Sequence, residues 1–193
     1  MYKRQAEYGS PVVAGFSLAA RIETMLAMVI WALSMSVAPF VGQNWGAGRR
    51  DRVRRAVFLG HGFALAWGLF AYLSLLLFAP IAIGLATDDE AVANAAQTYL
   101  LIVPLGMGLM GVCANAWNSF NALGRPLPPL LMSAAQMLCL TIPLAILGNN
   151  LFGFAGIFIG GLVSQLAIAL TAFVWLQRSI QGEANVPSYA NSA

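Results

Sequence analysis

The residues that could carry out acid–base chemistry are few and far apart. His61 is the only histidine among the 193 residues. The acidic residue that follows it, Asp88, would lie about 40 Å away if a single helix joined the two. Cys113 and Cys139 both fall within long apolar stretches, which indicates neither a disulfide framework nor a metal site. The sequence therefore predicts a protein that is not an enzyme and holds no cofactor or metal.

Amide and hydroxyl side chains could instead bind a solute. Asn115, Asn118 and Ser119 recur at helical spacing and would share one face of a helix that looks inward. Gln136 and Gln165 lie in the two apolar stretches that follow. Two interpretations stay open: these side chains line a substrate cavity, or they form hydrogen bonds between helices, worth about 0.6 to 2 kcal/mol each. The first interpretation makes all five candidates for substrate contact.

Arg21 and Glu23 are the charged residues nearest the middle of an apolar stretch. A charge at the centre of a bilayer costs about 2.5 to 3.5 kcal/mol and usually marks a pathway. The favoured interpretation is that both lie at the outer interface, because residues 24–43 alone are long enough to cross a membrane. The alternative is that Glu23 lines the outer mouth of a substrate cavity. Two positions apart on a helix, the two side chains point to different faces and are not expected to pair.

The distribution of charge defines the elements that hold these residues. Of all residues 60% are hydrophobic and only 9% are charged, which excludes an ordinary soluble domain. Four long stretches contain no Asp, Glu, Lys or Arg, and each can supply the roughly 20 apolar residues that cross a bilayer. The longest must turn back once, and we expect that turn at residues 148–150. The prediction is an all-α polytopic membrane bundle with helices near 14–43, 56–86, 92–122, 127–147 and 154–177.

Basic residues set the expected orientation. In a five-helix zigzag, the first and third connections and the end of the last helix lie on one side, and they carry seven arginines. The positive-inside rule assigns that side to the cytoplasm of a plasma (bacterial inner) membrane. Residues 1–12 are then an external loop or tail, 13–180 the membrane bundle and 181–193 a polar cytoplasmic tail. The arginines of the first connection, for which contacts with lipid headgroups are expected and nucleic acid is not, are Arg49, Arg50, Arg52, Arg54 and Arg55.

A glycine pattern in the third predicted helix must be distinguished from a nucleotide-binding loop. Residues 106–111 (GMGLMG) match G-x-G-x-x-G, but no strand precedes them. In an apolar helix, such glycines allow close approach of a neighbouring helix. We therefore expect them to be packing positions. Pro39, Pro104 and Pro143 are expected to bend their helices.

Two further stretches resemble a known family of membrane proteins. Residues 38–49 (APFVGQNWGAGR), preceded by 20–23 (ARIE) and followed by 51–56 (DRVRRA), closely resemble a signature of the multidrug and toxic compound extrusion (MATE) family. Residues 121–126 (NALGRP) resemble a later cytoplasmic loop of the same lobe. The resemblance implies part of a C-terminal lobe, whose partners would be the lipid bilayer, small amphiphilic substrates and either the missing N-terminal lobe or a second copy.

The same resemblance implies a function. Members have two six-helix lobes around a central cavity and export amphiphilic or cationic compounds in exchange for Na⁺ or H⁺, which would be the coupling ion of the full-length protein. The region that would carry a coupling acid in the third helix holds residues 112–115, none of them acidic, so no coupling residue is assigned.

Two alternatives to a portion of an antiporter stay open. One is a lipid-linked saccharide flippase of the same superfamily, which should line its cavity with several basic residues, whereas the predicted spans contain only Arg21. The other is a truncated, non-transporting membrane fragment. The chain alone is expected not to transport, because five helices supply at most one wall of an alternating-access site.

Overall fold

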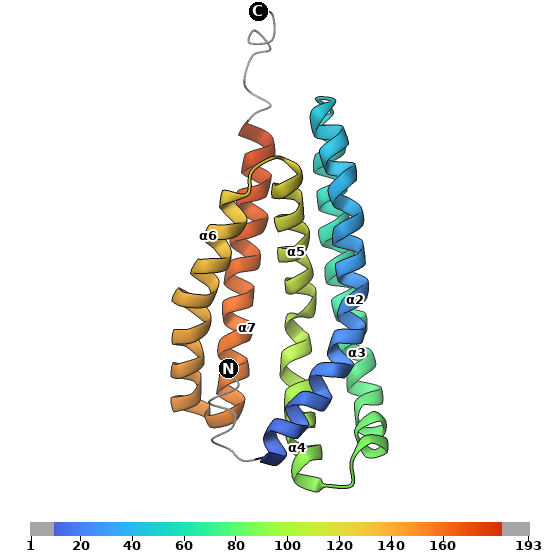
Figure 1. Ribbon diagram of the computed structural model, residues 1–193, viewed down its shortest axis with the longest axis vertical. Coiled ribbons are helices and arrows are strands. Elements are labelled where there is room, and N and C mark those ends of the chain that lie inside the picture. The colour runs from blue at the N-terminus through green and yellow to red at the C-terminus, as the bar shows by residue number, and fades with distance from the viewer. Residues whose placement is uncertain (1–9, 183–193) are drawn as a thin grey trace, which may run out of the picture.

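The computed structural model describes residues 10–182 as an elongated bundle of helices (Figure 1). Long apolar runs satisfy their backbone groups internally as helices, which is what a lipid environment requires. The elements are α2 (Ser10–Gly46), α3 (Arg50–Ala86), α4 (Glu90–Ile102), the 3₁₀ helix η2 (Val103–Gly106), α5 (Met107–Ala122), α6 (Leu127–Ala135), the π-helix η3 (Gln136–Thr141) and α7 (Ile142–Gly182).

Within the described residues, five helical segments are long and apolar enough to cross a membrane. This confirms the predicted number of spans and the all-α membrane class. The segments run alternately up and down, and their connections gather at the two ends of the bundle (Figure 1). The spans are Val13–Gly46, Arg50–Ala86, Glu90–Ala122, Leu127–Gly153 and Ala155–Gly182.

The first connection is shorter than expected. Residues 47–49 join α2 to α3, so Arg49 is the one arginine of the group in the connection, and those from Arg50 onward lie in the first turns of α3. Gly48 adopts a left-handed backbone (φ 70°), which lets the chain reverse at once. The Arg50 guanidinium then lies 3.3 Å from the centre of the Trp45 ring, a cation–π contact that closes the turn.

Two other expected boundaries differ. The chain reverses between the last two spans at Gly153 (φ 61°), whereas residues 148–150 remain helical. A Cβ on Gly148 would lie 2.0 Å from the Gly156 carbonyl oxygen, so these glycines serve close packing of the two arms of α7 rather than the turn. At the other end, residues 10–12 of the expected external loop belong to α2, and residues 181–182 of the expected tail belong to α7; residues 1–9 and 183–193 lie outside the described residues.

Glycines bring the central helices into backbone contact. A Cβ on Gly68 of α3 would lie 2.4 Å from the Cα of Gly108 in α5, and one on Gly111 would lie 2.9 Å from Ile30 of α2. The glycines of residues 106–111 are therefore packing positions, as the sequence predicted. Their effect is to fix α5 between α2 and α3.

Candidate functional site

Glu23 is held inside the bundle by a tyrosine of another helix. The Tyr99 hydroxyl of α4 donates a hydrogen bond to the Glu23 carboxylate of α2. Glu23 is half-buried, whereas Arg21 is exposed. The two charged side chains thus point to different faces, as their spacing predicted, and the carboxylate is directed toward the protein.

Aromatic rings line a cavity together with this carboxylate. Tyr99 makes edge-to-face contacts with Phe16 of α2 and Phe158 of α7, with ring centres 5.0 and 5.3 Å apart. These rings, Glu23 and Gln165 line a cavity of about 200 Å³, which we call the Glu23 pocket. A carboxylate in a cavity lined by aromatic rings is suited to a proton or a cation, because both carboxylates and π-systems attract positive charge.

Gln165 connects the Glu23 pocket to η3 and α5. Its side-chain oxygen accepts a 2.8 Å hydrogen bond from the amide of Gln136, and its own amide lies 3.5 Å from the Cys113 sulfur. At the neighbouring residue of α7, the hydroxyl of Ser164 lies 2.8 Å from that of Thr141. The structure therefore brings the two predicted glutamines together.

The π-helical turn explains why both η3 side chains reach α7. Gln136 and Thr141 are five residues apart, which in an α-helix would place them about 140° apart around the axis. In a π-helix, hydrogen bonds join residues five apart, so these positions lie on nearly the same face. The local widening thus directs both polar groups toward the same helix.

The predicted amide face on α5 lies elsewhere. Asn115 and Ser119 are fully buried, and the Asn115 amide donates a 3.3 Å hydrogen bond to the Val57 carbonyl of α3. Asn118 is half-buried. Neither the glutamines nor Glu23 belongs to this α3–α5 contact, and the role of Asn115, Asn118 and Ser119 in a substrate pathway stays a prediction.

Buried polar atoms near Asn115 form a second group. Among the described residues, the Asn115 Oδ1 and the Ser119 Oγ are buried without a hydrogen-bond partner, and the His61 ring nitrogens are buried close to the backbone of Val57 and Val112. The His61 ring packs edge-to-face on Phe173 of α7 at 5.5 Å. Sequence reasoning set His61 aside as a catalytic group, and the structure places it as a packed interior side chain.

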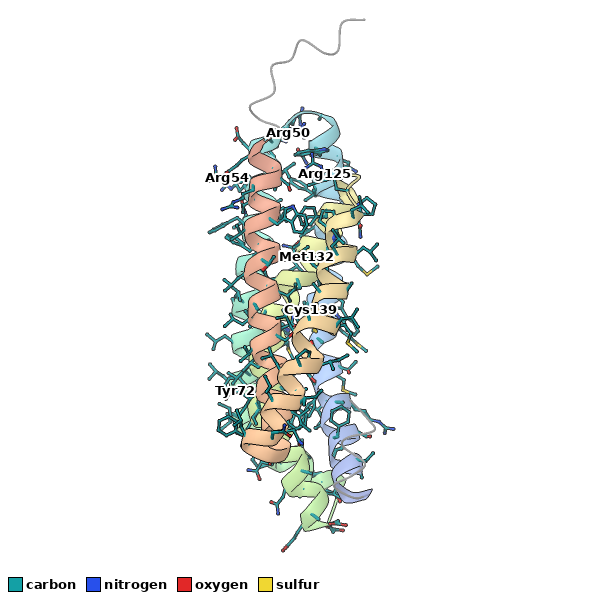
Figure 2. All side chains as sticks on the ribbon, turned by 90° about the vertical axis from the view of Figure 1, so that its left-hand side faces the viewer. Arg50, Arg54, Tyr72, Arg125, Met132 and Cys139 are labelled. Atoms are coloured by element: carbon teal, nitrogen blue, oxygen red, sulfur yellow. The ribbon has the colours of Figure 1, made fainter. Side chains whose placement is uncertain are left out.

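The arginines mark one end of the bundle. Arg50, Arg54 and Arg125 project at the same end, far from Tyr72 (Figure 2). We call it the arginine end; that it faces the cytoplasm stays a prediction of the positive-inside rule. Arg52 and Arg55 also border an apolar groove of about 1050 Å³ between α2 and α3.

Tyr99, Phe16 and Phe158 are the site residues that sequence reasoning missed. Tyr99 is the only tyrosine between residues 92 and 122, and its hydroxyl needs a partner when buried. Glu23 is the only acid in the predicted spans, but the sequence does not show that the helices of Glu23 and Tyr99 are neighbours. The two phenylalanines carry no such signal.

Comparisons with known proteins agree with this architecture. The family model MatE matches residues 5–147. The chain is 31% identical to the FAD transporter of Shewanella oneidensis over 166 residues and 25% identical to the multidrug export protein MepA of Staphylococcus aureus over 171 residues. These matches cover 86% and 88% of this chain but 37% of each relative.

A solved structure shows the same arrangement of helices. The Vibrio cholerae MATE transporter VcmN in the bent form superposes with a TM-score of 0.88 and 29% sequence identity. The superposition covers 94% of this chain and 42% of VcmN. This chain thus spans about two fifths of the length of the proteins it matches. With a family model over most of its residues, and five spans packed as in a solved member, the chain belongs to the MatE family of integral membrane transporters.

Proposed function

We propose that this bundle forms one wall of the transport pathway of a secondary efflux transporter that exports amphiphilic or cationic compounds in exchange for Na⁺ or H⁺. The observation that carries the proposal is the Glu23 pocket. A carboxylate within a membrane span is costly unless it is neutralised, and such residues usually mark ion or substrate pathways. Tyr99 holds this one in a defined position beside a cavity.

The chemistry of the pocket favours exchange of cations. Its volume of about 200 Å³ suits the charged head of a compound or a small ion rather than a whole drug molecule. A proton or Na⁺ on Glu23 removes the charge that attracts a cationic substrate. The two ligands would therefore exclude each other, which is the requirement for antiport.

The opposite wall of the pathway must come from other helices. Alternating access places the binding site between two helical bundles that move against each other. Because this chain matches 37% of each relative, we propose that the second bundle is supplied by the remaining length of such a transporter or by a second copy.

A second candidate substrate is a flavin dinucleotide. The 31% identity with a protein named FAD transporter favours it. The apolar groove between α2 and α3 combines the basic and aromatic residues that such a ligand needs, because Arg52 and Arg55 lie beside a wall that includes Phe58 and Phe63. In this alternative the arginines would bind the phosphates and the phenylalanines the flavin ring.

A chimera tests both candidates. Residues 13–182 replace the matching segment of the Shewanella oneidensis FAD transporter, and export of a cationic dye and of FAD is measured at equal membrane abundance. We expect the chimera to export the dye. Glu23→Gln should lower this export at least tenfold, and Tyr99→Phe should lower it less. Thr24→Val, at an exposed neighbour of Glu23, is the control. Dye export that survives Glu23→Gln contradicts the cation proposal, and FAD export without dye export supports the second candidate.

A further inference from the structure

A groove at the arginine end combines positive charge with an apolar wall. It lies between the turn that joins α5 to α6 and the last turns of α7, and its volume is about 860 Å³. Arg125 and Arg178 supply the charge, whereas Leu170, Val174 and Trp175 supply the apolar wall. We call it the basic groove.

Both sides of the basic groove are held in place by the fold. The backbone N–H of Arg125 donates to the Phe120 carbonyl (2.9 Å) in a tight turn that Gly124 makes with a φ of 73°. The Trp175 ring packs edge-to-face on the fully buried ring of Phe120, with centres 6.1 Å apart. One buried residue, Phe120, thus holds the arginine turn through its backbone carbonyl and the aromatic wall through its ring.

The groove has the polarity of a phospholipid. Leu170, Val174 and Trp175 are 58%, 42% and 37% exposed. From Leu170 to Arg178 the helix rises about 12 Å, close to the roughly 15 Å of one bilayer leaflet. A headgroup phosphate at the arginines would therefore leave an acyl chain lying along the apolar wall.

The charge of the groove selects among lipids. No acidic side chain of the described residues lines it. Basic pockets between helices on the cytoplasmic side bind anionic headgroups, and guanidinium groups pair well with phosphate oxygens.

We propose that the basic groove binds an anionic phospholipid, with its phosphate between Arg125 and Arg178 and one acyl chain against Leu170 and Val174. Ser179, which also lines the groove, supplies a hydroxyl donor for the headgroup. The site is separate from the Glu23 pocket, and it does not depend on which compound the transporter exports.

Native mass spectrometry of the purified 193-residue chain tests the proposal. The probes are dioleoyl phosphatidylglycerol, dioleoyl phosphatidylcholine and inorganic phosphate. We expect phosphatidylglycerol to bind at least tenfold more tightly than either of the others. The Arg125→Gln/Arg178→Gln chain should bind it about 30-fold more weakly, since each arginine near an anionic lipid is worth about fivefold in affinity.

The control is a double variant that also removes two positive charges from the arginine end. Arg49→Gln/Arg54→Gln removes two exposed arginines outside the groove and should change affinity less than twofold. The proposal would be overturned if both double variants lost the same affinity for phosphatidylglycerol. It would also be overturned if phosphatidylcholine or inorganic phosphate bound as tightly as phosphatidylglycerol.

A second variant separates the lipid chain from the charge. Leu170→Gln/Val174→Gln alters exposed side chains and keeps both arginines, so it should weaken phosphatidylglycerol at least fivefold. An unchanged affinity in this variant would also overturn the proposal, because it would mean that the apolar wall holds no acyl chain.

Discussion

The third and fourth membrane spans are both strongly apolar, yet the protein surrounds them very differently. Half of an 18-residue apolar stretch of Glu90–Ala122 is buried inside the protein, compared with 6% of the corresponding stretch of Leu127–Gly153. Glycines and amides make contacts in both spans, but those of the third span meet α2 and α3, whereas those of the fourth meet α7 and its other side presents Leu130, Leu131 and Leu138 to the exterior. The number of helices that a span packs against, rather than its apolarity, therefore separates the central span from the peripheral one.

The largest effect is expected at the backbone contact of the central span. Gly68→Leu places a side chain 2.4 Å from Gly108 and must separate α3 from α5. We expect a loss of about 3 kcal/mol or more in the free energy of unfolding. Unfolding in mixed micelles by SDS titration measures it. Gly62→Leu is the control on the same helix, because no atom lies within 4 Å of its added Cβ.

The buried amide of the central span comes next. Asn115→Leu removes the hydrogen bond to Val57 and should lower the unfolding free energy by about 1 to 2 kcal/mol. Asn118→Leu, at a half-buried position on the same helix, should change it by less than about 0.5 kcal/mol. Equal losses at the two positions would show that burial does not distinguish them.

The peripheral span depends on fewer contacts. Gln136→Leu breaks the 2.8 Å hydrogen bond to Gln165 and should cost about 0.6 to 1.7 kcal/mol. A double-mutant cycle with Gln165→Leu isolates that interaction. Additive effects of the two substitutions would mean that the bond does not hold the fourth span to α7.

The smallest effect is expected on the outer face of the peripheral span. Leu131 is 57% exposed, and lipid replaces its contacts, so Leu131→Ala should change the unfolding free energy by less than about 0.5 kcal/mol. Leu100→Ala, at a 2% exposed position, is the comparison and should cost about 2 kcal/mol or more. Equal losses would place the fourth span inside the protein.

Charge placement was enough to predict the spans, and helical spacing was enough to predict that Asn115 and Ser119 face inward. Turn positions were harder. Gly148 and Gly153 are both plausible turn residues in sequence, and only the packing of Gly148 on Gly156 decides between them. The arginines were expected in a loop because charge favours water, but a helix that extends beyond the bilayer satisfies the same requirement.

The Glu23 pocket could be predicted only in part. Glu23 was singled out because a membrane span holds it, but its partner depends on which helices are neighbours. The bond to Tyr99 joins residues 76 positions apart, and the contact of Tyr99 with Phe158 brings in a third helix. Hydropathy and spacing describe single helices, so they contain no information on such pairs.

The close contact between Gly148 and Gly156 has a consequence for biosynthesis. These residues are only eight positions apart, so bringing them together costs little loop-closure entropy, whereas the contact between Ile30 and Gly111 must wait until three spans have been made. Contacts of low sequence separation form early. The last two spans can therefore leave the translocon already paired as a helical hairpin, and the bundle is completed when this hairpin docks on the helices synthesised before it.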